Sequence, residues 1–326
     1  MNQLPMDMKV RVVAALVESN AIRGTARLLG VHKDTVMKLG VDVGQGCARL
    51  HDRLMRDLEV PSIQFDEMWS FVHKKEKRLG EGDDPETSGD QWLYLALGDT
   101  SKLIICYLVG KRTVQSTEAF IRDLRSRILN RPSMCSDGMR AYIDAIDKAF
   151  GGDVDYTMLV KSIVAEKDPA KLSHGADPDK PFVEKRRIQG SPDIEHASTS
   201  FVERNNLNVR MTTRRFARRT SGHSKKIENH RAAAALFVMY YNFCRVHETL
   251  RTTPAMAQGV TDRVWSIAEL IEAALAEGPA PAAPPITERD DGPPPMSRAG
   301  IGGKIYAYHS GRPTLKIIKG GLDAAS

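Results

Sequence analysis

Three short β-type runs, followed by a regular alternation of helices and strands, constrain the fold of this chain more than any other feature. The runs are rich in β-branched and aromatic residues and span residues 62–72, 92–97 and 102–109. Because short connections favour antiparallel pairing of consecutive strands, we expect these three to form a meander. Helical and strand patterns then alternate over residues 117–129 (helix), 133–136 (strand), 140–150 (helix) and 156–163 (strand). This alternation predicts that the later strands pair in parallel with the first.

This order of elements is that of an RNase H-like domain. The sequence therefore predicts an α/β fold with a mixed sheet flanked by helices over residues 62–275. A long polar stretch over 165–197 separates the last predicted strand from helices near residue 200 and over 225–245. A chain of 326 residues is long enough to hold this domain and a smaller one.

Residues 1–45 predict a small helix-turn-helix DNA-binding domain. Residues 22–29 and 31–39 have helical spacing on either side of Gly30, which can adopt the left-handed conformation of a tight turn. Val36 would pack inward from the second helix. The side chains expected on its outer face, placed to enter a major groove, are Lys33, Thr35 and Lys38. A helical hairpin that packs and binds nothing is the alternative.

The segments outside these two predicted domains have fewer features. Residues 46–61 predict a connector that is partly helical. Seven prolines between residues 279 and 295 predict a disordered linker over 276–300, and no role is assigned to 301–326. The longest apolar run has ten residues, about half of what a bilayer span requires, and the four cysteines are widely spaced. The chain is therefore expected to be soluble and cytoplasmic.

Three acidic residues fall where the predicted layout brings distant segments together. Asp66 lies in the first strand, Asp137 at the end of the fourth, and Glu203 in the helix after the fifth. Converging carboxylates raise one another's pKa unless cations compensate their charge. A pair of Mg²⁺ ions, for which Mn²⁺ can substitute, would remove the repulsion and serve an in-line phosphodiester displacement. We therefore expect all three residues to be metal ligands and catalytic residues.

Each of these acidic residues also has an ordinary structural explanation. Asp66 could be a charge at a strand edge, Asp137 the turn residue of an Asp-Gly pair, and Glu203 an acid in the first turn of a helix. The nearest rivals as ligands are Glu67 and Asp99. Glu67 follows Asp66 on a strand, so we expect it to point to the opposite face, and Asp99 is expected in a hairpin loop.

Positive charge is concentrated in one segment. Residues 204–231 contain nine Lys or Arg and one acid, a net charge of +8 in a chain whose total is +6. Such a block indicates a polyanionic partner, although a solvated helix face would have the same composition. Helical spacing predicts that Glu203, Asn206, Arg210 and Arg214 share one face, with the guanidinium groups placed for phosphate. The residues of this segment predicted to bind DNA are Arg204, Arg210, Arg214, Arg215, Arg218, Arg219, Lys225 and Lys226.

Several motifs resemble those of DDE transposases from bacterial insertion sequences, most closely the group of insertion sequence one. Phe65-Asp-Glu-Met-Trp-Ser70 and Cys135-Ser-Asp-Gly138 are similar to the first and second Asp motifs of that group. The region around its catalytic Glu is similar to residues 198–210, 214–220 and 224–228. The resemblance covers roughly residues 20–260.

This resemblance implies an RNase H-like core, Mg²⁺ dependence and recognition of terminal inverted repeats by the N-terminal domain. It also implies catalytic roles for Asp66, Asp137 and Glu203. The chain departs from compact members of the group in the 65 residues that separate Asp137 from Glu203.

These observations predict a DNA transposase. One step would cleave a phosphodiester at an element end and expose a 3′-hydroxyl, and the next would join that hydroxyl to target DNA. The expected partners are double-stranded DNA, both as terminal inverted repeats and as target, and at least one further copy of the chain. Two alternatives stay open: a helix-turn-helix regulator with an inactive nuclease-like domain, and a metal-dependent nuclease without strand transfer.

Overall fold

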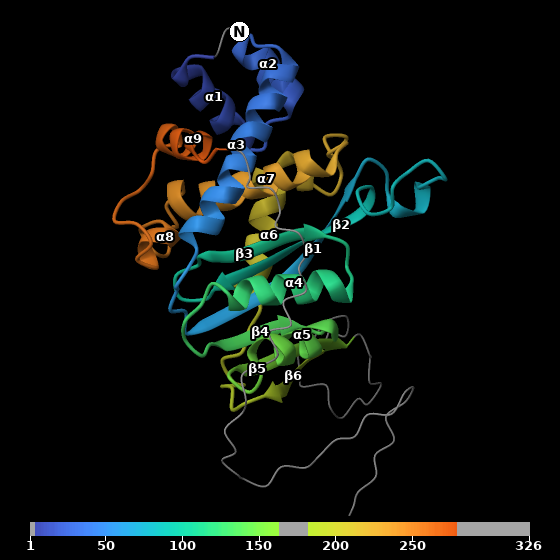
Figure 1. Ribbon diagram of the computed structural model, residues 1–326, viewed down its shortest axis with the longest axis vertical. Helices are drawn as coiled ribbons and strands as arrows, with labels where there is room; N and C mark the ends of the chain where they lie inside the picture. The colour runs from blue at the N-terminus through green and yellow to red at the C-terminus, as the bar shows by residue number, and fades with distance from the viewer. Residues whose placement is uncertain (1–3, 163–181, 279–326) are drawn as a thin grey trace, which may run out of the picture. The chain divides into compact units, whose positions relative to one another are not determined.

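A six-stranded mixed sheet lies at the centre of the computed structural model, which describes residues 4–162 and 182–278 (Figure 1). The strands lie in the order β3-β2-β1-β4-β5-β6. They span Ser62–Val72 (β1), Gly89–Gly98 (β2), Ile104–Gly110 (β3), Ser133–Asp137 (β4), Asp155–Ser162 (β5) and Phe182–Gln189 (β6). β2 pairs antiparallel with β1 and β3, whereas β4 pairs in parallel with β1 and with β5. The predicted mixed sheet and its RNase H-like element order are thereby confirmed.

β6 was not expected, because the sequence predicted an irregular polar stretch over 165–197. It pairs antiparallel with β5 at the edge of the sheet. Residues 183–187 are exposed, and they include Glu184, Lys185, Arg186 and Arg187. An edge strand exposed on both faces has no alternation of apolar and polar residues, and charges on it oppose pairing with other chains. The pattern that reveals an inner strand is therefore missing here.

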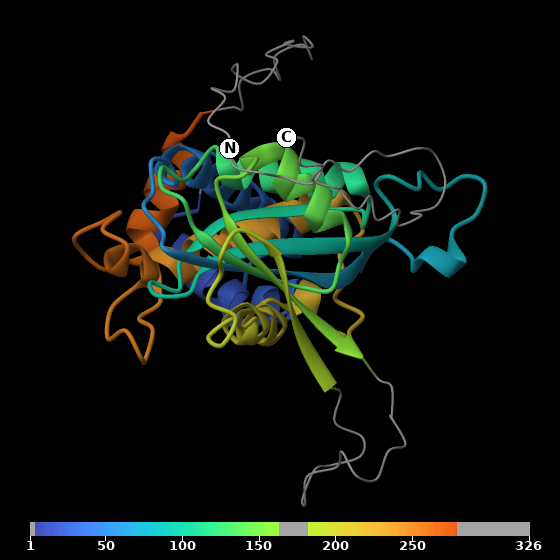
Figure 2. The same cartoon turned by 90° about the horizontal axis from the view of Figure 1, so that it is seen from below.

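Helices cover both faces of the sheet. Those of the described residues are α1 (Met6–Val17), α2 (Ile22–Leu29), α3 (Lys33–Leu54), α4 (Val114–Arg125), α5 (Ala141–Phe150), α6 (Ser200–Thr212), α7 (Ile227–Met239), α8 (Pro254–Ala257) and α9 (Ile267–Ala276). Figure 2 shows α4 and α5 on one side of the sheet and α6 on the other. The sheet is therefore sandwiched between two helical layers, as predicted.

Alternate residues of β1 face different helical layers. Phe65 packs against Tyr142 of α5, with ring centroids 4.7 Å apart. Met68 instead belongs to a second buried cluster that includes Val202 of α6 and Phe237 of α7. Because side chains alternate across a strand, the position of a residue along β1 decides which helices it meets.

The helix α3 is longer than the sequence predicted. The predicted turn is present, since Gly30 adopts a left-handed conformation (φ 66°) between α2 and α3. The second helix does not end at residue 39 but continues to Leu54, so the first part of the expected connector 46–61 is helical. The expected domain boundary at residue 45 falls inside α3, and Met1–Ala280 form one compact unit.

Two predictions concern segments of the chain that the structure describes only in part. No helix in the described ranges is long and apolar enough to cross a membrane. From residue 279 on, the predicted linker 276–300 and the segment 301–326 lie outside the residues that the structure describes.

At its first residue, Ile104, the edge strand β3 pairs with a side chain rather than with another strand. Asn242 lies in a π-helical turn that follows α7, and it is fully buried. Its Oδ1 accepts a hydrogen bond from the backbone N–H of Ile104 (3.0 Å), and its Nδ2 donates to the carbonyl oxygen of Ile104 (2.9 Å). The amide thus pairs with the edge of β3 as a neighbouring strand would.

We expect Asn242→Ala to lower the free energy of unfolding by about 1–3 kcal/mol, because the backbone N–H of Ile104 would lose its buried acceptor. The carbonyl oxygen of Ile104 would keep only its contact with Nε2 of His51 (3.3 Å). Urea denaturation measures this change. Asn208→Ala, at a half-exposed position of α6, is the matched control and should change stability by less than about 0.5 kcal/mol. Equal effects of the two substitutions would contradict the role given to Asn242.

Candidate active site

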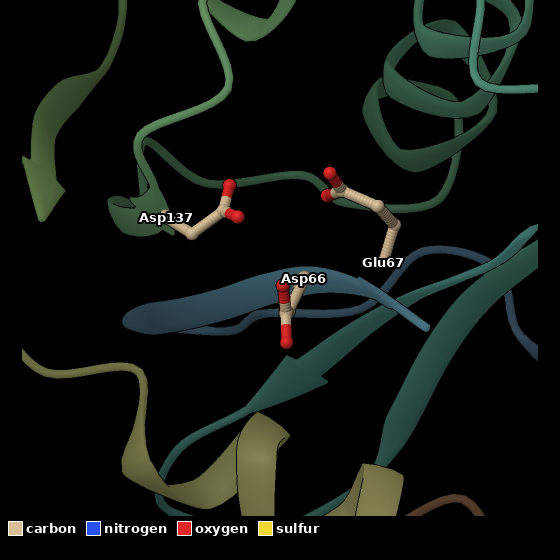
Figure 3. Close-up of side chains that lie close together, drawn as sticks. All are labelled: Asp66, Glu67 and Asp137. Carbon is tan, nitrogen blue, oxygen red and sulfur yellow. The ribbon is translucent and has the colours of Figure 1, made fainter. Parts of the chain in front are cut away.

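Two of the predicted acidic residues meet where β1 pairs with β4. Phe65 and Ser136 are partners in this parallel ladder, so the next residues, Asp66 and Asp137, are neighbours on adjacent strands. Carboxylate oxygens of Asp66, Glu67 and Asp137 all lie within 4.8 Å of one another (Figure 3). The parallel pairing that the sequence predicted therefore brings Asp66 and Asp137 together.

Glu67 joins this group although the sequence analysis had set it aside. As expected from strand alternation, its surroundings belong to the opposite face from those of Asp66. Its Oε1 accepts a hydrogen bond from Nε of Arg112 (2.8 Å), and its Oε2 accepts one from the hydroxyl of Tyr142 in α5 (3.1 Å). β4 ends at Asp137, so the longer Glu side chain can extend past the end of that strand. In the sequence, the feature that pointed to Glu67 was its place directly after Asp66, on a strand expected to pair with the strand that ends at Asp137.

The clustering of acids raises their affinity for protons. The pKa of Asp66 is raised to about 7, first by burial and then by the charges of Asp137, Glu67 and Glu203. The pKa of Glu67 is also raised, mainly by burial and by Asp137, and the Arg112 guanidinium opposes that rise. The site therefore holds negative charge that the described protein groups compensate only in part.

α6 runs along β1 and is fixed to it at three points. At its start, Oε1 of buried Gln64 accepts hydrogen bonds from the backbone N–H groups of residues 201 (3.0 Å) and 202 (3.3 Å). In its middle, Nδ2 of Asn206 donates to Oδ2 of Asp66 (2.8 Å). Near its end, Arg210 donates to the carbonyl oxygen of Trp69 (3.1 Å). These contacts place the helix beside the carboxylates.

Glu203 lies on α6 one turn before Asn206, on the side of Asp66. Its Oε1 accepts a hydrogen bond from the hydroxyl of Thr199 (2.8 Å), and its charge contributes to the raised pKa of Asp66. It is not a member of the group of carboxylates within 4.8 Å, in which Glu67 is the third acid. Its role as the third ligand stays a prediction.

The helix face that was predicted to carry phosphate-binding guanidinium groups is shorter than expected. α6 ends at Thr212, so Arg214 lies in the following turn and not on the face of Glu203. Arg210 donates to the carbonyl oxygens of Phe216 and Trp69. Arg215 donates to Oγ of Ser224 (3.0 Å). Arg210 and Arg215 therefore make contacts inside the protein.

The other predicted DNA-binding residues lie at the surface. The predicted DNA-binding residues of the basic segment that are exposed are Arg204, Arg214, Arg218, Arg219, Lys225 and Lys226. Near the start of α3, Lys33 and Lys38 are exposed and Thr35 is half-buried. Their contacts with DNA stay predictions.

The chemistry of the donor set fits a hard divalent cation. Carboxylate oxygens are the ligands that Mg²⁺ prefers, and it needs only one or two of them besides water and phosphate oxygens. Beside Asp66, Oδ1 of Asn206 is buried and has no hydrogen-bond partner among the described residues, which leaves an acceptor for a hydrated ion. Asp66, Asp137 and either Glu67 or Glu203 could hold such a cation.

No family model and no curated protein matches the chain. Among solved structures it is similar to the piggyBac transposase in a synaptic complex with hairpin DNA, at a TM-score of 0.34 and 11% identity over 81% of this chain. The chain spans 58% of the length of that protein. It is also similar to the Mos1 transposase in a paired-end complex with the left transposon end, at a TM-score of 0.20 and 15% identity, covering 74% of this chain and 79% of that one.

We expect Asp66→Asn to stabilise the metal-free protein above pH 7. The carboxyl has a pKa of about 7 in the folded chain against an ordinary 3.8. Ionisation therefore weakens the fold progressively from about pH 4 to pH 7. The gain in the free energy of unfolding should be about 1–3 kcal/mol above pH 7, since one pKa unit corresponds to about 1.4 kcal/mol and relaxation reduces the full effect.

Urea denaturation in the presence of a chelator, repeated across pH, measures this gain. Below about pH 3 the two proteins should be equally stable, because Asp66 is then mostly protonated in both the folded and the unfolded chain. Asp144→Asn, at an exposed position of α5, is the control and should show no such pH dependence. A gain that persists unchanged in acid would contradict the electrostatic explanation.

A second prediction concerns the start of α6. Gln64→Ala should leave two backbone N–H groups without their acceptor, which costs about 1–3 kcal/mol. We expect the loss to appear locally, as faster amide hydrogen exchange over residues 200–206, measured by mass spectrometry. Gln45→Ala, at an exposed position of α3, should leave that exchange unchanged. Unchanged exchange in Gln64→Ala would mean that other contacts hold the helix.

Proposed function

We propose that this chain is a DNA transposase, a metal-dependent enzyme that cuts DNA at element ends and joins the ends to target DNA. The proposal rests on the meeting of Asp66 and Asp137 on adjacent parallel strands, with their carboxylates near each other and near Glu67. α6 adds Asn206, hydrogen-bonded to Asp66, and Glu203. The motifs that resemble the insertion sequence one group support the finer assignment.

The chemistry would consist of two phosphoryl transfers. In the first, a water oxygen attacks the phosphorus at the element end, and the bond from that phosphorus to the 3′-oxygen breaks and leaves a 3′-hydroxyl. In the second, this hydroxyl oxygen bonds to a target phosphorus and displaces the target's 3′-oxygen. Mg²⁺ or Mn²⁺, when bound, would stabilise charge on the attacking and leaving oxygens.

The chain's own residues would position that chemistry. Asp66, Asp137 and Glu203 would hold the cations, and Glu67 is the alternative third ligand. Asn206 keeps the carboxylate of Asp66 in place through its hydrogen bond. Little further chemistry is required of the protein, because catalysis of phosphoryl transfer depends mainly on positioning and charge stabilisation.

DNA would be bound by two sets of residues with different tasks. Lys33, Thr35 and Lys38 on α3 would contact base edges of a terminal inverted repeat. Phosphate contacts, which position DNA without reading it, would come from Arg204, Arg214, Arg218, Arg219, Lys225 and Lys226. Because two element ends must be joined, the active complex would contain at least two copies of the chain.

The test uses a supercoiled plasmid that carries the flanks of the chain's own gene, incubated with purified protein and Mg²⁺ or Mn²⁺. We expect 3′ nicks at the element ends and joined products. Asp66→Asn and Asp137→Asn should each reduce both by at least about 100-fold, as loss of a major charge-stabilising group does. Asp144→Asn, at an exposed position of α5, should react like the wild type.

Two further variants identify the third ligand. Glu203→Gln and Glu67→Gln remove one charge each, and we expect the larger loss of cleavage in Glu203→Gln. A larger loss in Glu67→Gln would assign the third position to Glu67. DNA binding without cleavage in either metal would overturn the proposal in favour of a regulator. Nicks without joined products would indicate a nuclease.

A further inference from the structure

The N-terminal helices share a hydrophobic core with the rest of the chain. The same buried cluster contains Val12 of α1 and Val36 of α3 together with Phe243 and Leu270 from the C-terminal part of the described chain. α3 connects these regions without a break, from Lys33 to Leu54. A tethered DNA-reading module would have a core of its own and a flexible linker.

Two glycines allow α3 to touch its neighbours backbone to backbone. A Cβ atom on Gly44 would lie 2.3 Å from the carbonyl oxygen of Ala232 in α7. A Cβ atom on Gly46 would lie 2.0 Å from the carbonyl oxygen of Ala274 in α9. These are backbone atoms, which cannot rotate away as the end of a side chain can. The two crossings therefore fix the position of α3 against α7 and α9.

Hydrogen bonds at the ends of the N-terminal helices add to this attachment. The backbone N–H of Ser19, between α1 and α2, donates to the carbonyl oxygen of Thr212 at the end of α6 (2.8 Å). Arg53, near the end of α3, forms an ion pair with Glu277 (2.7 Å). The first contact joins the predicted DNA-reading helices directly to the helix that carries Glu203 and Asn206.

The same junction forms a groove with a largely apolar lining and several basic side chains. A cavity of about 490 Å³ is lined on one side by the end of α1, α2 and α3, and on the other by residues 213–225 and α7. Its basic side chains are Arg23, Arg214, Arg215 and Lys225, and no acidic side chain occurs among the described residues that line it. Lys33 and Lys38 are exposed on α3, the helix whose Val36 and Met37 line this cavity. A polyanion that contacts α3 can thus reach the basic segment without leaving the surface.

We propose that the N-terminal helices and the basic segment 213–226 form one DNA-binding surface of fixed geometry. α3 then sets the distance between the sequence that is read and the phosphodiester that is cut. Gly44 and Gly46 are positioning residues in this arrangement. The inference rests on the proposed function, because it concerns where that activity falls on duplex DNA.

Binding alone provides the first test. Hydroxyl-radical footprinting without metal, on a duplex from the gene's own flank, should give one continuous footprint. The double variant Lys33→Ala/Lys38→Ala should lose protection at the end of the footprint farther from the cut. The double variant Lys225→Ala/Lys226→Ala should lose protection at the end nearer the cut. Two footprints separated by unprotected DNA, or loss of the same end in both double variants, would overturn the inference. This outcome does not depend on cleavage.

Cleavage by the wild-type protein provides the second test. Insertions of one, two and five base pairs are placed between the footprint and the cleaved phosphodiester. We expect the cut to stay at a constant distance from the footprint and so to move into the inserted DNA. A cut that stays at the original phosphodiester despite the insertions would overturn fixed spacing. If even the uninterrupted duplex is not cut in Mg²⁺ or Mn²⁺, the proposed function fails, and the footprints still decide the inference.

Gly46→Ala tests the crossing itself. We expect cuts to spread over several neighbouring phosphodiesters, because the added methyl group must push α3 away from α9. Gly152→Ala is the control, since a Cβ atom there meets nothing within 4 Å, and it should cut at a single position. A single unshifted cut in a folded Gly46→Ala protein would remove that residue from the positioning role. If Gly46→Ala does not fold, the insertion series with wild-type protein decides.

Discussion

Mutual repulsion among the carboxylates where β1 meets β4 is the constraint around which this structure is arranged. Asp66 is largely buried and lies beside Asp137 and Glu67, so both desolvation and like charge oppose its ionisation. A group of this kind weakens the folded state at neutral pH when no cation is present. Packing alone gives no reason to gather such residues, whereas a function that needs bound cations does.

The two neighbouring acids on β1 are treated differently by the two helical layers. Glu67 accepts hydrogen bonds from the guanidinium of Arg112 and the hydroxyl of Tyr142, both on the α5 side of the sheet. Asp66 accepts a hydrogen bond from the neutral side-chain amide of Asn206, on the α6 side of the sheet. A neutral donor orients a carboxylate and leaves its charge in place. A guanidinium orients the carboxylate and also compensates its charge. Negative charge is therefore left where the motif resemblance places the metal ligands.

Much of this arrangement could be predicted from the sequence, because it follows from local patterns and connection rules. Short connections and the helix–strand alternation predicted the order and directions of the first five strands. Parallel pairing of adjacent strands then predicted the meeting of Asp66 and Asp137. Glu67 was named only as a rival ligand, because strand alternation describes where a side chain starts and not how far it reaches. The contacts of Arg210 with the carbonyl oxygens of Phe216 and Trp69 were not foreseen, because charge alone does not distinguish a phosphate ligand from a donor to backbone carbonyls.

The length of α3 could not be predicted for a reason that bears on function. Gly40, Gly44 and Gly46 each lower helix propensity by about 1 kcal/mol relative to Ala, so the local pattern predicts an ending. Tertiary contacts reverse that preference, since a side chain at Gly44 or Gly46 would collide with the backbone of α7 or α9. The residues that weaken the isolated helix are thus the ones that let it pack. A helix that depends on the core for its own stability cannot move independently of that core, so its exposed first turns keep a set position relative to the carboxylates.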